Sequence, residues 1–113
     1  MAEEPWPAEW QRGLLPTAVL GAIGGEPMYG YRISQRLERL GWGTITGGAL
    51  YPVLRSLEDA GLLTSRWEAD GPGPARRYYD LTERGRQAVD RRRASWSRFS
   101  TSMTTLFGEE ARR

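Results

Sequence analysis

The first long apolar segment of the chain, residues 14–23, is hydrophobic on nearly every side. This pattern predicts a buried helix with Pro16 in its first turn and Gly24-Gly25 at its end. Upstream of this segment, Trp6 and Trp10 lie four residues apart, which is typical of one face of a separate short helix opened by a proline.

Two amphipathic segments follow. Over residues 30–40 apolar residues recur at helical spacing opposite an arginine face, and Gly41 supplies a stop signal. A second helix over residues 47–60 buries a stripe with i, i+3, i+4, i+7 spacing and is capped by Thr46. The loop between the two helices is expected to include a short strand at 44–46. The apolar stripes consist of Ile33, Leu37 and Leu40 in the first helix and Leu50, Val53, Leu54 and Leu57 in the second.

Two further segments predict a β-hairpin. Residues 63–68 and 76–81 have strand composition, and the Asp-Gly-Pro-Gly-Pro sequence at 70–74 between them allows only a turn or loop. Thr82 then caps a last helix, with Glu83 favourable in its first turn.

This last helix, expected over residues 83–107, carries a heptad seam with one polar interruption at Arg92. Its roughly 25 residues, at ~1.5 Å each, make a rod about 37 Å long, which overhangs so small a core. We therefore expect the seam to hold a homodimer, with Trp6 and Trp10 packed over the partner's last helix. The seam positions are Val89, Arg92, Trp96, Phe99, Met103 and Leu106.

The amino-acid composition removes much of the chemistry that enzymes use. The 113 residues include no cysteine, histidine or lysine, which excludes disulfides, thiolate metal sites, imidazole acid–base catalysis and Schiff bases. The 14 carboxylates and five tyrosines form no recognisable catalytic constellation. We expect neither an enzyme, nor a metal site, nor a cofactor.

All 16 basic residues are arginine, and most lie in the second half of the chain. Residues 61–98 carry nine arginines and five acidic residues, a net charge of +4, whereas residues 1–26 carry a net charge of −3. A basic block in a small domain suggests a polyanionic partner. The exclusive use of arginine fits codon bias in a GC-rich genome, and it also fits guanidinium recognition of phosphate and guanine. The composition leaves both explanations open.

The location of the protein is expected to be cytoplasmic. The first ten residues are acidic and have no apolar stretch, unlike a secretory signal. The longest apolar-rich segment is too short to span a bilayer.

The predicted order of helix, helix, helix, hairpin and helix is that of a winged helix-turn-helix. The expected fold class is mainly α with a small β-hairpin (α+β). Residues 1–82 form the winged domain with an N-terminal helix, 83–107 a dimerisation helix and 108–113 a tail. In such a fold one helix enters the DNA major groove while the wing contacts phosphates. The alternative is a winged-helix module that binds protein and not DNA, which the basic second wing strand disfavours.

Three segments resemble the PadR family of transcriptional regulators. Residues 28–33 (Met-Tyr-Gly-Tyr-Arg-Ile) are similar to the opening of that family's second helix, and residues 46–63 are similar to its recognition helix. Residues 74–85 resemble its wing and helix cap. The match spans about residues 12–107. It includes Pro52, which is otherwise unexpected inside a helix but is a feature of this family.

The resemblance implies a homodimeric transcriptional repressor on a pseudo-palindromic operator, relieved by a small aromatic ligand. Family members often control phenolic-acid metabolism or drug efflux. Gly47 departs from the proline that the family usually has, which is expected to loosen the start of the recognition helix. The short tail after Phe107 resembles compact members that dimerise through a single C-terminal helix.

The candidate DNA contacts lie on the predicted recognition helix, the preceding helix and the wing. We expect Tyr51 and Arg55, four residues apart, to contact bases or phosphates, with half-buried packing as the alternative for Tyr51. Arg76 and Arg77 alternate across a strand, so Arg76 is the freer phosphate ligand if the next apolar residues point inward. Of the tyrosines flanking Gly30, one is expected to pack and the other to meet phosphate. The full set is Tyr29, Tyr31, Thr46, Ala49, Tyr51, Arg55, Ser56, Arg76 and Arg77.

Trp96 has two interpretations. It is a core residue of the dimer seam or, with its symmetry mate, one plate of a pocket for a planar or cationic aromatic effector. Phe99 and Met103, its next heptad neighbours, complete the expected effector site. The resemblance favours a ligand because a tryptophan recurs there in ligand-responsive members. Trp42 and Trp67 are expected in the local core or supporting the wing.

Overall fold

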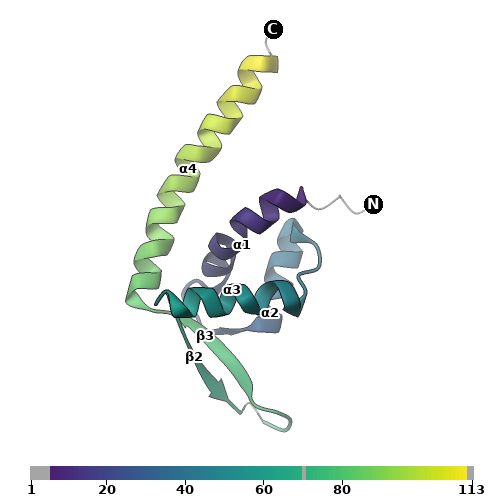
Figure 1. Ribbon diagram of the computed structural model, residues 1–113, viewed down its shortest axis with the longest axis vertical. Coiled ribbons are helices and arrows are strands. Elements are labelled where there is room, and N and C mark those ends of the chain that lie inside the picture. Colours follow the sequence, from purple (N-terminus) through teal and green to yellow (C-terminus); the bar gives the residue numbers. More distant parts are fainter. Residues whose placement is uncertain (1–5, 70, 112–113) are drawn as a thin grey trace.

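The computed structural model describes residues 6–69 and 71–111 of the chain. Four helices and a small sheet make up the fold (Figure 1), so the predicted mainly helical α+β class is confirmed. In chain order the elements are α1 (Ala8–Ile23), β1 (Met28–Tyr29), α2 (Gly30–Leu37), the π-helical turn η1 (Glu38–Trp42), α3 (Gly47–Asp59), β2 (Leu63–Glu68), β3 (Arg76–Leu81) and α4 (Glu83–Ala111).

The core forms where helices α1, α2 and α3 meet. The buried residues of each helix lie on the side that faces the core, and each fully buried aliphatic side chain contributes about 1.5–3 kcal/mol. In α3 the predicted stripe is confirmed, with Val53 half-buried at its edge. The most deeply buried side chains are Val19, Leu20, Ile23, Ile33, Leu50 and Leu54.

The sheet has three antiparallel strands in the order β1-β3-β2. Strands β2 and β3 have the predicted bounds, and their register pairs Leu63 with Leu81 at the base of the hairpin. Strand β1 does not follow from the sequence pattern. It is two residues long and exists because Met28 pairs with Tyr79 across the sheet.

Both predicted threonine caps are confirmed. The Thr46 hydroxyl accepts a hydrogen bond from the Ala49 amide at 3.2 Å, which begins α3. The Thr82 hydroxyl accepts from the Gly85 amide at 3.0 Å and donates to the Gly61 carbonyl at 2.6 Å. Thr82 therefore begins α4 and also ties it to the turn that ends α3.

The first helix differs from the prediction. A single helix begins at Ala8, with Trp10 in its first turn and Trp6 before it. The prediction of a separate short helix upstream is therefore wrong. Pro16 consequently lies in the helix interior and not in its first turn. The proline removes one backbone hydrogen bond, but packing of the apolar face against the core keeps the helix continuous.

The region after α2 also differs from the prediction. The α-helix ends at Leu37 and continues as the wider turn η1, inside which Gly41 has a φ of 99° that favours glycine. Leu40 therefore points to solvent and not into the core. Residues 44–46 form no strand, because β1 occupies the free edge of β3.

Helix α4 extends to Ala111, beyond the expected end at 107, and at ~1.5 Å per residue its 29 residues span about 43 Å. Figure 1 shows its C-terminal half rising away from the body, while the hairpin projects from the opposite end. The molecule is accordingly elongated, with extents of 61 × 36 × 20 Å.

Candidate nucleic-acid interface

Helix α3 presents a polar face on the side away from its buried stripe. Tyr51, Arg55 and Ser56 are exposed there, and with Pro52 and Asp59 they border a cleft of about 400 Å³. Hydroxyl and guanidinium groups on one helix face match the acceptors of base edges and phosphates.

Gly30 lets the Tyr51 ring lie against the start of α2. A Cβ atom at position 30 would lie 2.6 Å from the Tyr51 hydroxyl oxygen, so any side chain there would displace the ring. The two positions therefore fix how the exposed face of α3 meets the N-terminus of α2.

The tyrosines on either side of Gly30 have different environments. The Tyr29 ring is half-buried and meets the edge of Tyr78, with ring centroids 5.5 Å apart. Tyr31 is 64% exposed. Tyr29 is thus the packed member of the pair, and Tyr31 is the one accessible to a partner.

Arg76 is exposed and stacks on an aromatic ring. Tyr79 and Leu81 are buried, so Arg76 points away from the core, and its guanidinium carbon lies 4.6 Å from the centre of the Tyr29 ring. Among the ion pairs of the described residues, none involves Arg76. Stacking on an aromatic face limits the side chain's freedom and leaves its N–H groups available.

Arg77 is already engaged within the protein. Its Nη2 lies 3.3 Å from Glu58 Oε1 on α3, and its Nε donates to the Ser65 hydroxyl at 2.9 Å. Sequence reasoning misses Glu58, because its partner lies 19 residues away and no local pattern links the two.

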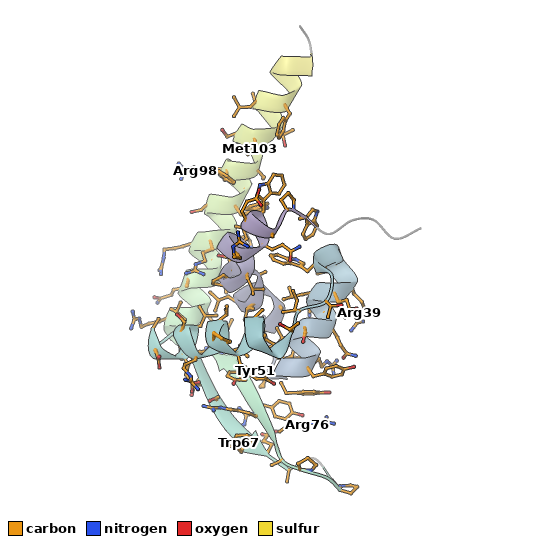
Figure 2. The ribbon with its side chains drawn as sticks, turned by 45° about the vertical axis from the view of Figure 1, so that its right-hand side comes forward. Arg39, Tyr51, Trp67, Arg76, Arg98 and Met103 are labelled. Carbon is orange, nitrogen blue, oxygen red and sulfur yellow. The ribbon has the colours of Figure 1, made fainter. Side chains whose placement is uncertain are left out.

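A continuous groove joins α2, α3 and the wing. A cavity of about 570 Å³ has Tyr29, Tyr31, Tyr51, Arg76 and Arg77 on its lining. Figure 2 shows Tyr51, Trp67 and Arg76 on this side of the molecule, far from Met103 on α4.

Not every candidate contact lies at this groove. Arg55 and Ser56 border the adjoining cleft on α3, which Tyr51 shares. Thr46 and Ala49 instead line a separate cleft of about 390 Å³ that faces the start of α1.

The sequence predicts Trp67 in the local core or supporting the wing. Its side chain on β2 is instead 67% exposed. Its ring centre lies 5.9 Å from the Arg77 guanidinium carbon. It belongs to the surface of the wing because β2 leaves the body beyond Ser65, where the outer residues have no core to enter.

Tyr79 and Arg66 of the sheet have shifted pKa values. Burial raises the pKa of the Tyr79 hydroxyl above its ordinary value, and the positive charge of Arg77 opposes this shift. On the wing, the hydrogen bond to Glu68 raises the pKa of Arg66, at an N–O distance of 2.7 Å. Arg66 is thus paired with a carboxylate of its own strand, whereas Arg76 makes no ion pair among the described residues.

A second cavity lies between α1, η1 and α4. It has a volume of about 440 Å³ and an uncharged lining. The Trp6 and Trp42 rings meet edge-to-face at 5.5 Å, and the Trp96 ring lies 5.9 Å from Phe99. The lining residues are Trp6, Trp10, Gln11, Leu14, Trp42 and Trp96, hereafter the tryptophan pocket.

The two ends of the predicted heptad seam have different surroundings. Val89 packs against the protomer's own core, and Arg92 Nη1 donates to the Thr17 hydroxyl of α1 at 3.2 Å. Phe99 and Leu106 are exposed, and Met103 is half-buried. The available apolar face of α4 therefore starts near Trp96, beyond the part that packs on α1.

Within residues 6–69 and 71–111, no group of three or more acidic residues is arranged to hold a metal ion. No helix in the same part of the chain is both long and apolar enough to cross a membrane.

An N-terminal helix, a helix pair that ends in an exposed polar helix, and a two-stranded wing beside that helix define a winged helix-turn-helix protein. The family model described as the transcriptional regulator PadR-like family matches residues 19–91. The chain belongs to this family of transcriptional regulators, which are not enzymes, and the resemblance found in the sequence is confirmed.

Individual relatives agree with this assignment. The chain is 37% identical over 86 residues to Transcriptional regulator Rv3488 of Mycobacterium tuberculosis (strain ATCC 25618 / H37Rv), covering 74% of this chain and 78% of that protein. It is similar to the PadR-like regulator BC4206 of Bacillus cereus, with a TM-score of 0.81, 29% identity, and coverage of 88% of this chain and 97% of the other. Bacillus subtilis PadR in complex with operator DNA is similar with a TM-score of 0.61 and 30% identity, over 68% of this chain and 45% of that one.

Proposed function

We propose that this chain is a homodimeric repressor that binds a pseudo-palindromic DNA operator and leaves it when a planar aromatic ligand binds beside Trp96. The observation that carries the proposal is the groove that brings Tyr51 of α3 next to Arg76 of the wing, with Arg55 on the adjoining cleft. The operator DNA bound by Bacillus subtilis PadR supports DNA as the partner.

The two arginines have separate roles in this proposal. Arg76, stacked on Tyr29 and without an ion pair among the described residues, contacts a phosphate. Arg55 projects from the recognition helix α3 and contacts a base edge. In a dimer the two α3 helices enter successive major grooves, roughly 34–36 Å apart along the DNA.

These roles predict different effects of two substitutions. Arg76→Gln should weaken binding to every duplex and lower the slope of log affinity against log salt by about one, because one counterion-releasing contact is lost. Arg55→Gln should cost about 1–3 kcal/mol on the preferred site and little on random DNA, because a base contact is lost. The measurement is salt-dependent titration of a duplex selected by the wild-type protein from a random-sequence pool, alongside a random duplex.

Arg98→Gln is the matched control for these titrations. Arg98 is exposed on α4, far from the groove, so its loss should change neither affinity nor salt slope appreciably (Figure 2). If the wild-type protein selects no sequence from the pool, the proposal is wrong and the protein-interaction module becomes the better assignment.

The tryptophan pocket supports the effector half of the proposal. Four indole rings surround a cavity of about 440 Å³ within one protomer, and none of the lining side chains is charged. Indole faces bind planar apolar rings and attract cations, so a neutral or cationic aromatic ligand fits better than an anionic one. Since Trp96 lies on α4, a ligand there would change how α4 meets α1 and hence the spacing of the two recognition helices.

Removing one indole tests this site. A planar aromatic cation, titrated into free protein by calorimetry, should bind the wild type and bind Trp96→Ala at least about tenfold more weakly. Trp67→Ala, which removes an exposed indole from the wing, should bind as the wild type does. The ligand must also bind DNA-free protein more tightly than DNA-bound protein, as linkage requires. Equal affinity of the Trp96→Ala and wild-type proteins would assign Trp96 to packing alone.

A further inference from the structure

Three polar side chains join the recognition helix to both strands of the wing. The Ser65 hydroxyl of β2 donates to Glu58 Oε2 of α3 at 2.7 Å and accepts from Arg77 Nε of β3 at 2.9 Å. The same arginine closes the ring through its Nη2, 3.3 Å from Glu58 Oε1. We call these residues the Glu58–Ser65–Arg77 triad.

The triad lies where the hairpin leaves the body of the protein. Toward the base of the wing, Leu63 and Tyr79 are buried in the core. Toward the tip, Trp67 and Arg76 are exposed. The triad therefore joins α3 to the wing at the point where the apolar core ends.

Arg77 differs from its neighbour Arg76 in how its charge is used. It is paired with Glu58, and its guanidinium carbon lies between two rings, 5.9 Å from the Trp67 centroid and 5.7 Å from the Tyr79 centroid. A cation already paired within the protein gains little from a phosphate unless the internal pair breaks.

Glu58 carries a negative charge at a surface where DNA is expected. With Tyr51, Arg55 and Arg77 it lines a cleft of about 600 Å³ beside the groove. For phosphate binding alone such a carboxylate is unfavourable, because it repels the backbone of the duplex. Glu58 instead contacts both strands of the wing, through Ser65 of β2 and Arg77 of β3.

We infer that Arg77, held through Glu58 and Ser65, is a positioning residue: it fixes the wing against α3 so that Arg76 and the α3 side chains reach the DNA together. The inference rests on the proposed DNA binding. It gives Glu58 a part in sequence-specific binding, although its negative charge by itself is unfavourable for binding DNA.

Neutralising Glu58 separates positioning from simple electrostatics. Glu58→Met removes a negative charge, so a random duplex should bind as well as or better than it binds the wild type. The wild-type-selected duplex should bind at least about fivefold more weakly, because the wing is no longer held in register with α3. A loss of general stability would not produce these opposite changes, and retained binding of the random duplex shows that the variant is folded.

Two further variants complete the experiment. Arg77→Met should weaken the selected duplex without changing the salt slope, and combining it with Glu58→Met should add little, since both remove one connection. Asp59→Asn is the matched control, because Asp59 lines the same cleft but makes no ion pair among the described residues. It should strengthen binding to both duplexes.

Two results would overturn the inference. If Glu58→Met binds the selected duplex as tightly as the wild type or more tightly, the triad does not position the wing. If Arg77→Met lowers the salt slope by about one, Arg77 is a phosphate ligand. A wild-type protein with no preference for the selected duplex contradicts the proposed function itself, which is a different outcome.

Discussion

Tyr79 places a titratable hydroxyl on a side chain that is only 4% exposed. Burial raises its pKa because the phenolate form is desolvated, while Arg77 opposes the shift. A pKa above the unfolded value means that the folded protein holds this proton more tightly than the unfolded chain does. The resulting stabilisation is present below the ordinary tyrosine pKa and is lost as pH rises through the folded value.

The composition makes this effect measurable. Because the chain has no histidine, cysteine or lysine, side chains of those types do not add to the pH dependence at alkaline pH. We expect the free energy of unfolding to fall above about pH 10, and to fall less in Tyr79→Phe. Chemical denaturation across this pH range, with Tyr31→Phe as the exposed control, is the measurement. If the free energy of unfolding falls as steeply with pH in Tyr79→Phe as in the wild type, Tyr79 is not the source of the alkaline destabilisation.

The hairpin and helix α3 could be predicted from the sequence to within one residue. Their signals are local: a Gly/Pro-rich turn between two strand-like segments, and an apolar stripe that begins after Thr46. Tyr51 and Arg55 lie beside this stripe, so the pattern indicates an accessible edge but leaves half-buried packing of Tyr51 open. The structure exposes both side chains.

The elements and contacts that could not be predicted depend on distant partners. Strand β1 is too short to have a pattern of its own and forms through pairing with β3. The different roles of Arg76 and Arg77 depend on Tyr29 and Glu58, which come from other elements. The tryptophan pocket likewise joins α1, η1 and α4, whose residues lie far apart in the chain.

At the level of the whole molecule, α4 carries a series of exposed large apolar side chains. Its C-terminal half rises clear of the body (Figure 1). Several of its large hydrophobic side chains are exposed. The exposed members from Trp96 onward are Trp96, Phe99, Leu106 and Phe107. Continuity of this face with the exposed Trp10 of α1 favours one extended surface covered by a second copy of the chain.

A charge in this surface should disrupt the proposed dimer. Met103→Glu places a carboxylate among the apolar residues of α4 and should raise the dimer dissociation constant at least about tenfold, because the charge would be buried without a partner. Thr101→Glu is the matched control, since position 101 lies on the opposite side of the helix. Sedimentation velocity over a micromolar concentration series is the measurement, and a monomeric wild type across that range would contradict the dimer.

The contact between Gly30 and Tyr51 has an evolutionary consequence. A Cβ atom at position 30 would displace the end of the exposed Tyr51 ring, so a change at one position alters the space open to the other. Among relatives that keep this backbone, a residue larger than glycine at the first position should occur together with a smaller residue at the second. The two sites should therefore covary, so the identity of one limits which residues drift can place at the other.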